Sequence, residues 1–416
     1  MSARWWDRAR GWRSGPRAAL GLGALTALAL SPALTLDCAS GLPSTRPLDA
    51  STPPGATAAS NAFGFDLYAR LGHATDNVIC SPLSAAIALN MASAGARGPT
   101  HTEMLTVLHV DPLHAAETHA SFGGLLAALN ARDGTAGLAL HVADRLWGQS
   151  GLAFKPDFLA VLRDSYGAPL EAVDFARASE AARATINHWA ATQTRGRIPE
   201  ILVAGDLDAE TGLVLTNAVY FKAWGTHLRR FTGVSGAANV PMMAEERFFA
   251  YARDGDVQIV ELPYHGDLSM VVVLPKGAGD LPVVEWMLAR RYASWIAALR
   301  PKKVEVWLPR WTSRSRLDLG APLSAAGMPL AFSPAADFSA ISDARLSIAK
   351  VLQEAFIDVN ETGTEAAAVS AATMEMQSIE IPLPRPFHAD HPFLYLIRDR
   401  KTGAVLFLGR VTDLRP

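Results

Sequence analysis

Residues 361–380 have the sequence ETGTEAAAVSAATMEMQSIE, in which most residues are small and neither proline nor, after Gly363, glycine occurs. The content of Ala, Met and Glu favours a helix. Counting by twos gives a different result, because the even-numbered positions from Thr364 to Met376 are uncharged, whereas Glu365 and Glu375 have the other parity. Such alternation is typical of a strand with one buried face, although alanine is a poor strand former. The stretch could therefore become a strand without being strongly committed to it.

The composition of the whole chain is that of a globular protein. It has 416 residues, of which 50% are hydrophobic, and a formal net charge of −2 at pH 7. Such a chain can bury a sizeable core. Its charge gives no reason to expect a nucleic-acid partner.

The N-terminal region has the pattern of an export signal. Arginines in residues 1–17 precede an apolar run over residues 18–30, which is too short to favour a permanent membrane span. We therefore predict a signal peptide over residues 1–38 and a secreted protein, extracellular or periplasmic. A lipid anchor at Cys38 is the alternative, although Asp37 occupies the position where a small residue is expected.

The rest of the chain predicts one α+β domain behind a linker. Residues 39–60 are rich in Pro, Ser, Thr and Ala and predict a flexible tether, and residues 61–416 contain no second linker of this kind. Helical patterns dominate the first half, among them a buried helix with Ser81 as its N-cap and Pro82 at its first position. Strand-like runs dominate the second half, which favours α+β over alternating βαβ units. They include VQIVELPY (257–264), LSMVVVLP (268–275) and KKVEVWLPRW (302–311).

Signatures of catalysis are absent from the sequence. It contains no G-x-S-x-G, H-E-x-x-H, C-x-x-C or P-loop motif. His388 and His391 have a spacing that could bind a metal, but the apolar residues after them favour the entry to a buried strand. We therefore predict a protein that is not an enzyme and holds no metal or cofactor.

Nine stretches between residues 61 and 413 together carry a resemblance to the serpins, a family of protease inhibitors, here of an exported and bacterial type. The stretches are NVICSPLSAAIALNMASAGARGPT, INHWAATQTRGRIPEIL, LVLTNAVYFKAW, VPMM, ELPYHGDLSMVVVLP, LPRW, ADFSAIS, AFIDVNETGTEAAAVSAAT and DHPFLYLIRDRKTGAVLFLGRV. The resemblance implies a fold of three β-sheets and about nine helices with an exposed reactive loop. A protease cleaves this loop, which then inserts into the largest sheet as an extra strand and traps the acylated protease.

The resemblance assigns the opening stretch to the reactive loop. Its inhibitory hinge matches Glu361, Gly363, Thr364, Ala366, Ala367, Ala368 and Val369. The family cleaves about sixteen residues after the position of Glu361, which selects the Gln377–Ser378 bond, with Met376 and Met374 as alternatives. A serpin-fold protein that binds or chaperones without inhibiting is the alternative function.

The target is predicted from the residues near the cleaved bond. No Lys or Arg occurs between Lys350 and Arg385, which argues against a trypsin-like protease, whose pocket would leave a carboxylate unpaired. Subtilisin-, chymotrypsin- or elastase-like enzymes fit better, with a papain-like protease as another candidate. We expect a monomer that forms a covalent complex with its target.

The resemblance also implies positions that control insertion. The shutter, where the central strands part, corresponds to Ser81, Ser84 and Asn217, with Gln353 where the family usually has histidine. Trp224 corresponds to the breach, where the loop begins to enter. The segment after Trp224 is shorter than usual, which predicts a trimmed strand pair beside the loop.

Overall fold

The computed structural model describes most of the chain after residue 53. The described residues are 54–71, 76–132, 141–223, 227–264, 267–359 and 383–415, with the backbone alone for 54, 141–142, 217–223 and 227. Within this part, no helix is both long and apolar enough to cross a membrane.

Eight α-helices occur among the described residues, and local sequence explains several of their ends. They are α1 (Pro54–Arg70), α2 (Pro82–Ser93), α3 (Gly98–Val107), α4 (Ala115–Asn130), α5 (Pro156–Tyr166), α6 (Phe175–Gln193), α7 (Leu281–Ala298) and α8 (Gly320–Ala326). Proline occupies the first turn of α2, where its missing N–H costs nothing. Gly167 ends α5 in the left-handed conformation with φ of 62°, which favours glycine.

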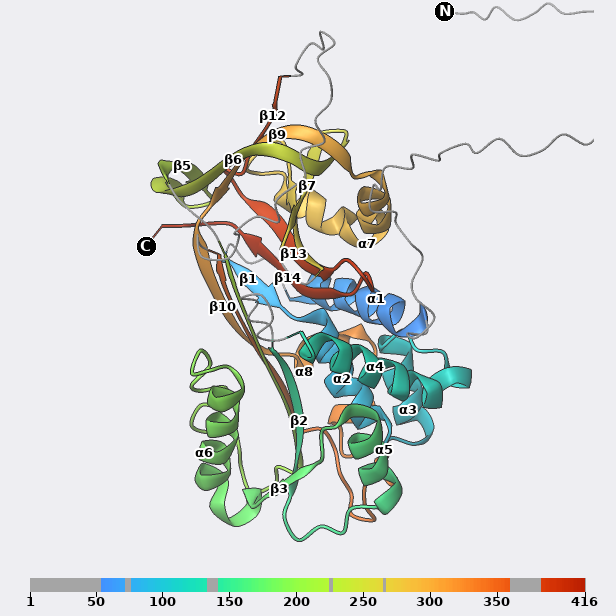
Figure 1. Ribbon diagram of the computed structural model, residues 1–416. Helices are drawn as coiled ribbons and strands as arrows, with labels where there is room; N and C mark the ends of the chain where they lie inside the picture. Colours follow the sequence, from blue (N-terminus) through green and yellow to red (C-terminus); the bar gives the residue numbers. More distant parts are fainter. Residues whose placement is uncertain are drawn as a thin grey trace, which may run out of the picture. The chain divides into compact units, whose positions relative to one another are not determined.

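A five-stranded sheet forms the long axis of the domain in Figure 1. Its strands, in spatial order, are β10 (Trp311–Asp318), β11 (Lys350–Val359), β4 (Leu213–Ala223), β2 (His141–Gln149) and β3 (Glu171–Val173). Neighbours β10 and β11 are antiparallel, β11 and β4 are parallel, and β4 and β2 are antiparallel.

A nine-stranded sheet contains the other described strands. They are β1 (Val78–Cys80), β14 (Val405–Val411), β13 (Phe393–Asp399), β8 (Leu268–Leu274), β7 (Val257–Pro263), β6 (Gly236–Asp254), β9 (Arg300–Pro309) and β12 (Arg385–His388), with β5 (His227–Gly233) paired to β6. Two of the three expected sheets are joined because β6 is one strand of 19 residues that pairs with β5 and β9 and, at its C-terminal end, with β7.

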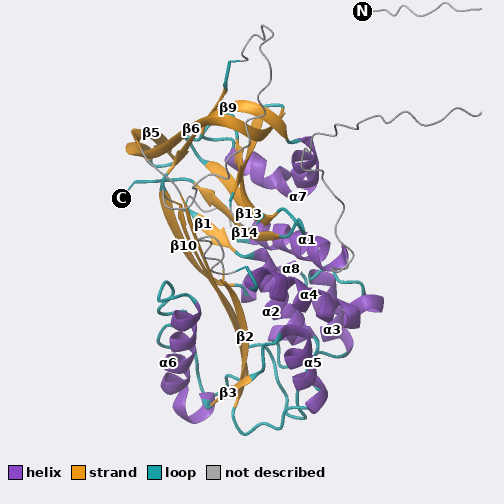
Figure 2. Cartoon of the chain, in the orientation of Figure 1, coloured by secondary structure: helices purple, strands orange, loops and turns teal. Residues whose placement is uncertain are grey.

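Helices cover both faces of the five-stranded sheet. Figure 2 shows α6 on one face and the group that includes α2, α4 and α5 on the other. The helix α6 buries an apolar cluster against the sheet that includes Trp147 of β2, Val214 of β4 and Leu352 of β11. The larger core lies between the other helices and the two sheets.

The structure confirms the predicted α+β class and corrects two local predictions. The helix α1 begins at Pro54 and buries Ala56 and Ala59, so residues 54–60 are not part of a flexible linker. Ser81 occupies the N-cap position of α2 but makes no side-chain capping bond. The strand pair after Trp224 is formed by β5 and β6, which are joined by a turn of two residues, 234 and 235. That this pair is shorter than is usual in the family stays a prediction.

Candidate functional site

The strands β11 and β4 form a parallel pair in the middle of the five-stranded sheet, and we call this pair the seam. Its register runs from Lys350 opposite Val214 to Val359 opposite Ala223. The chain leaves β11 at Val359, directly before residues 360–382. A strand that returned from this point between β11 and β4 would run antiparallel to both of them. Antiparallel pairs are slightly more stable per residue than parallel ones. One strand added at the seam would therefore replace the parallel pairing of β11 and β4 by two antiparallel pairings.

A buried group of polar contacts lies behind the seam. The Gln353 side chain of β11 is 1% exposed, and its Oε1 accepts a hydrogen bond from Ser81 N while its Nε2 donates one to Ser81 O, both at 2.8 Å. The Ser81 hydroxyl donates to Leu406 O at 2.8 Å and lies 3.1 Å from Ser84 Oγ. These contacts tie β11 to the start of α2 and to β14.

Three of the four predicted shutter residues therefore meet in the structure. Asn217 lies opposite Gln353 in the register of β4 and β11, but its side chain is outside the described part. The Ser81 hydroxyl is used for the contact with β14, which explains why it does not cap α2.

The opposite face of β11 meets the layer that contains α6. Successive side chains of a strand alternate between its faces, so Leu352 and Glu354 lie on the side opposite to Gln353. Leu352 packs in the apolar cluster of α6. The Glu354 carboxylate is 1% exposed and accepts a hydrogen bond from Arg314 Nε of β10. Burial raises the pKa of Glu354, and the neighbouring Arg314 opposes that rise.

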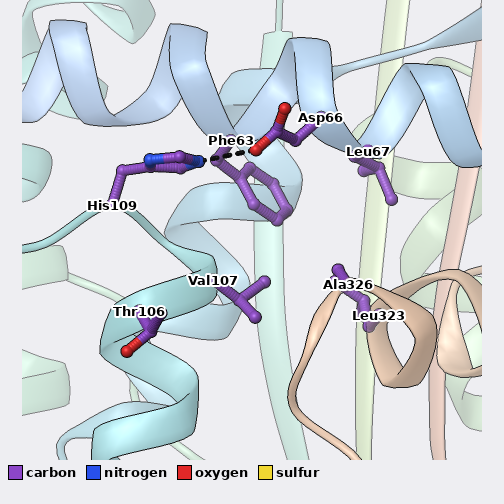
Figure 3. Close-up of a pocket in the computed structure, with 8 residues that line it drawn as sticks. All are labelled: Phe63, Asp66, Leu67, Thr106, Val107, His109, Leu323 and Ala326. Atoms are coloured by element: carbon purple, nitrogen blue, oxygen red, sulfur yellow. Dashed lines mark hydrogen bonds and ion pairs between the residues drawn. The ribbon is translucent and has the colours of Figure 1, made fainter.

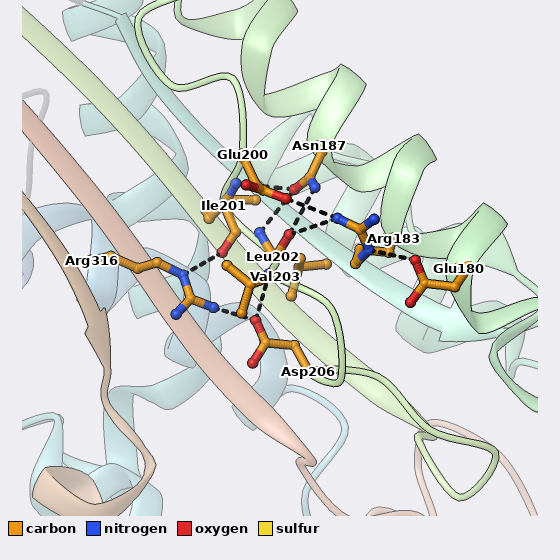
Figure 4. A network of polar contacts seen from close by, with 9 residues as sticks. All are labelled: Glu180, Arg183, Asn187, Glu200, Ile201, Leu202, Val203, Asp206 and Arg316. Carbon is orange, nitrogen blue, oxygen red and sulfur yellow. Dashed lines mark hydrogen bonds and ion pairs between the residues drawn. The ribbon is translucent and has the colours of Figure 1, made fainter.

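A polar network connects α6, the segment 200–206 and the strands β10 and β11, and Figure 4 shows all of it except Lys350 of β11. Arg183 of α6 donates to Glu200 Oε1 at 2.9 Å, and Asn187 of α6 bonds to the backbone of Ile201 and Leu202. On the sheet side, Asp206 accepts from Arg316 of β10 and from Lys350 of β11, the latter at 2.8 Å. Sequence reasoning did not find this network, because Arg316 and Lys350 are far from Asp206 in the chain and the members form no motif.

The predicted reactive loop and breach lie outside the described residues. This applies to the hinge residues Glu361, Gly363, Thr364, Ala366, Ala367, Ala368 and Val369, to the bond Gln377–Ser378 with its alternatives Met376 and Met374, and to Trp224. The assignments for these residues stay predictions.

The two histidines with metal-ligand spacing have separate roles in the structure. His391 lies 2.8 Å from Asp390 Oδ1 and 2.8 Å from Pro275 O. The His388 ring stacks on Trp307 with the ring centroids 3.6 Å apart. Across the described ranges, no group of three or more His, Cys, Asp or Glu residues is arranged to hold a metal ion.

A small cavity of about 180 Å³ lies between α1, the end of α3 and α8. Its floor is apolar and includes Phe63 and Leu323, while at its rim His109 Nε2 lies 2.9 Å from Asp66 Oδ2 (Figure 3). The volume is below the range of pockets that bind drug-sized ligands. None of its lining residues belongs to the seam.

Comparisons with known proteins identify the family. A protein-family model described as serpin (serine protease inhibitor) matches residues 58–414. The leukocyte elastase inhibitor of Sus scrofa is 37% identical over 381 residues, which are 86% of this chain and 99% of the relative. Serpin B8 of Homo sapiens is 40% identical over 373 residues, which are 85% of this chain and 98% of the relative. An uncharacterized serpin-like protein of Thermococcus kodakarensis is 40% identical over 368 residues, covering 85% of each chain.

Solved structures agree with this result. Uncleaved ovalbumin is 29% identical, with a TM-score of 0.77 over 86% of this chain and 100% of ovalbumin. A structure described as a tumour suppressing serpin has a TM-score of 0.78 at 25% identity. The match covers 87% of this chain and 100% of that serpin. The chain therefore belongs to the serpin family, whose model is described as serine protease inhibitor. Family membership indicates a target protease as the partner.

The comparisons contradict the predicted secretion. The leukocyte elastase inhibitors of Sus scrofa and Bos taurus align over 99% of their own length, which leaves no room in them for a leader ahead of the serpin domain. The prediction that the protein is secreted, extracellular or periplasmic, or lipid-anchored, is therefore wrong. The relatives named here come from animals and an archaeon and give no support to an exported, bacterial type of serpin.

Proposed function

We propose that this protein inhibits a serine endopeptidase as a suicide substrate. The serine hydroxyl of the protease attacks the carbonyl carbon of Gln377, the peptide bond to Ser378 breaks, and the amine of Ser378 leaves as the new N-terminus. The acylated part of the loop then enters the seam before water hydrolyses the ester. The protease is thereby carried to the far end of the five-stranded sheet.

One observation carries this proposal. The sheet has no strand between β11 and β4, whose parallel pairing is continuous from Lys350 to Val359. The loop sequence follows β11 directly, so the chain between Val359 and the cut can fold back as an antiparallel strand. The small side chains of Ala366, Ala368 and Ala372 favour entry between packed neighbours, because they leave little volume to accommodate.

The target class follows from the residues before the predicted cut and from the relatives. Met374, Met376 and Gln377 suit pockets that accept uncharged side chains. Several relatives are named leukocyte elastase inhibitors. We propose an elastase- or chymotrypsin-like enzyme as the first target class, a subtilisin-like enzyme as the next, and a papain-like enzyme as a further candidate.

The proposal is tested with a panel of elastase, chymotrypsin, subtilisin, papain and trypsin. We expect a complex that survives SDS with at least one of the first three enzymes and only cleavage or no reaction with trypsin. Mass spectrometry of the released C-terminal fragment identifies the cut bond. Cleavage by every active protease without a stable complex would contradict inhibition and favour the binding role.

The variant Ala368→Glu tests the insertion step in the same assay. It places a charge at one of the even-numbered loop positions, whose side chains must be buried when the loop inserts. Burying an unpaired charge is costly. We expect the variant to be cleaved at a rate similar to wild type and to trap little protease. A matched change on the other parity, Ala367→Glu, should retain trapping. Equal trapping by both variants would show that the parity assignment is wrong.

A further inference from the structure

Asp206 links the strands β10 and β11, on one side of the seam, to the segment 200–206. This segment leads along the chain into β4, on the other side of the seam. Asp206 lies seven residues before β4 begins at Leu213. Its side chain is 11% exposed and accepts a hydrogen bond from Lys350 Nζ of β11 at 2.8 Å. It also accepts hydrogen bonds from Arg316 of β10 and from Val203 N, the latter at 2.8 Å (Figure 4). Arg316 also donates through Nε to Ile201 O at 2.9 Å.

The segment that carries Asp206 is fastened to α6. Asn187 of α6 accepts from the N–H groups of Ile201 and Leu202 at 3.0 and 2.8 Å and donates to Leu202 O at 2.8 Å. This amide is 8% exposed, so its three bonds are shielded from water. These bonds hold the segment against the helix.

The helix α6 is in turn fastened to the β4 side of the seam. The Trp189 ring of α6 makes an edge contact with Trp147 of β2, with the ring centroids 5.7 Å apart. The guanidinium of Arg145, also on β2, lies 5.3 Å from the centroid of the Trp189 ring. Because β2 pairs with β4, these contacts attach α6 and the segment 200–206 to the β4 side of the seam, while Leu352 of β11 also joins the apolar cluster of α6. Arg316 and Lys350 belong to β10 and β11.

We propose that Asp206 is a latch across the seam, whose ion pairs with Lys350 and Arg316 must break before the reactive loop can insert fully. Lys350 lies at the end of β11 farthest from Val359, so the latch holds the end of the seam that an entering strand reaches last. The strength of the latch sets the rate of full insertion and hence the division between trapping and hydrolysis of the acylated protease. This inference rests on the proposed function.

The charge state of Asp206 is consistent with a latch at neutral pH. Burial works to raise the pKa of this carboxyl, but hydrogen bonds from Lys350 and Val203, together with the charges of Arg316 and Lys350, hold the pKa below its usual value. The carboxylate is therefore ionised when the protein meets its protease.

The test compares Asp206→Asn with wild type in the uncleaved and the cleaved form. Without the negative charge, we expect the rate of loop insertion into the sheet to rise at least threefold and fewer inhibitor molecules to be consumed per trapped protease. The uncleaved form should melt at a lower temperature than wild type. The cleaved form should melt unchanged, because full insertion has already separated Asp206 from its partners.

A second variant and a control keep the result specific. Lys350→Gln should reproduce the effect, and the double variant should differ little from Asp206→Asn alone, since both changes break the same contact. Asp254→Asn is the matched control, because Asp254 accepts from Arg291 and Trp295 away from the five-stranded sheet. It should lower the melting temperature of both forms equally and leave the insertion rate unchanged.

Each contrary result has a distinct meaning. If Asp206→Asn lowers the melting temperature of both forms equally, or leaves the insertion rate as in wild type, Asp206 has a structural role alone and the latch is wrong. If cleaved wild-type protein gains no stability over the uncleaved form, the loop does not insert, and the proposed function is overturned together with the latch.

Discussion

His119 of α4 is a histidine that the fold keeps neutral. Its Nδ1 lies 2.7 Å from the hydroxyl of Tyr166 on α5. Burial, helped by the neighbouring His101, lowers the pKa of His119 to about 4 from the ordinary 6.5. As pH falls from 6.5 towards 4, the unfolded chain therefore binds a proton at this residue that the folded protein does not bind. Linkage then requires that stability decreases through this window.

We expect His119 alone to make the free energy of unfolding about 2 kcal/mol smaller at pH 5 than at pH 8. The variant His119→Gln, which cannot titrate here, should reduce the pH difference by that amount. Urea unfolding midpoints at the two pH values measure it, with the exposed His188→Gln as control. A pH difference in His119→Gln equal to that of wild type would refute this role.

Single residues differ in how far sequence could identify them. Ser81, Ser84 and Gln353 were predicted to meet, because the resemblance to a family assigned all three to the place where the central strands part, and they do meet. No such signal marks Asp206, and Asn187 lies within one of the stretches that carry the resemblance but was assigned no role by it. Asp206 lies in an irregular segment, and its partners are 110 and 144 residues away in the chain. Local patterns carry no information about contacts of this kind.

Among the elements, β4 and β11 are the pair whose environment should change most on cleavage. Each would exchange a parallel neighbour for an antiparallel one, with new hydrogen bonds on both sides of the entering strand. We expect amide hydrogen exchange in residues 213–223 and 350–359 to become slower after cleavage of the loop. The pair β13 and β14 in the other sheet should show no change. Equal exchange in both forms across β4 and β11 would contradict strand insertion.

Sequence patterns predicted strands better than their neighbours in space. The runs over residues 257–264 and 268–275 became β7 and β8 nearly as expected. The run KKVEVWLPRW over residues 302–311, in contrast, contains most of β9 and the first residue of β10, which belong to different sheets. Pro309 ends β9, since it has no N–H to continue the ladder. Which sheet each strand joins is decided by tertiary packing, which local alternation does not encode.

For the whole molecule, the proposed insertion implies that the uncleaved form is not the most stable one. Roughly a dozen new hydrogen bonds at about 1 kcal/mol each, with burial of Met374 and Met376, amount to a gain on the order of 15 kcal/mol. This equals the stability of an entire domain. The uncleaved form would therefore persist because of a kinetic barrier.

Calorimetry tests this inference directly. We expect protein cleaved within residues 374–378 to unfold at a temperature many degrees above that of uncleaved protein. A cut in a loop that cannot insert should give no such increase. If cleavage between these residues leaves the melting temperature unchanged or lowers it, the kinetic account of the uncleaved form fails.

The placement of β14 and β13 determines what becomes of the protein once it has been cut. The piece from Ser378 to the C-terminus contains both strands, and they occupy the interior of the nine-stranded sheet between β1 and β8. Every residue of β14 is buried. The two polypeptides would thus remain a single particle after scission, and only a denaturant would part them. Protein that was cleaved without trapping a protease would keep the size of the intact chain under native conditions, and denaturing electrophoresis would separate its two fragments.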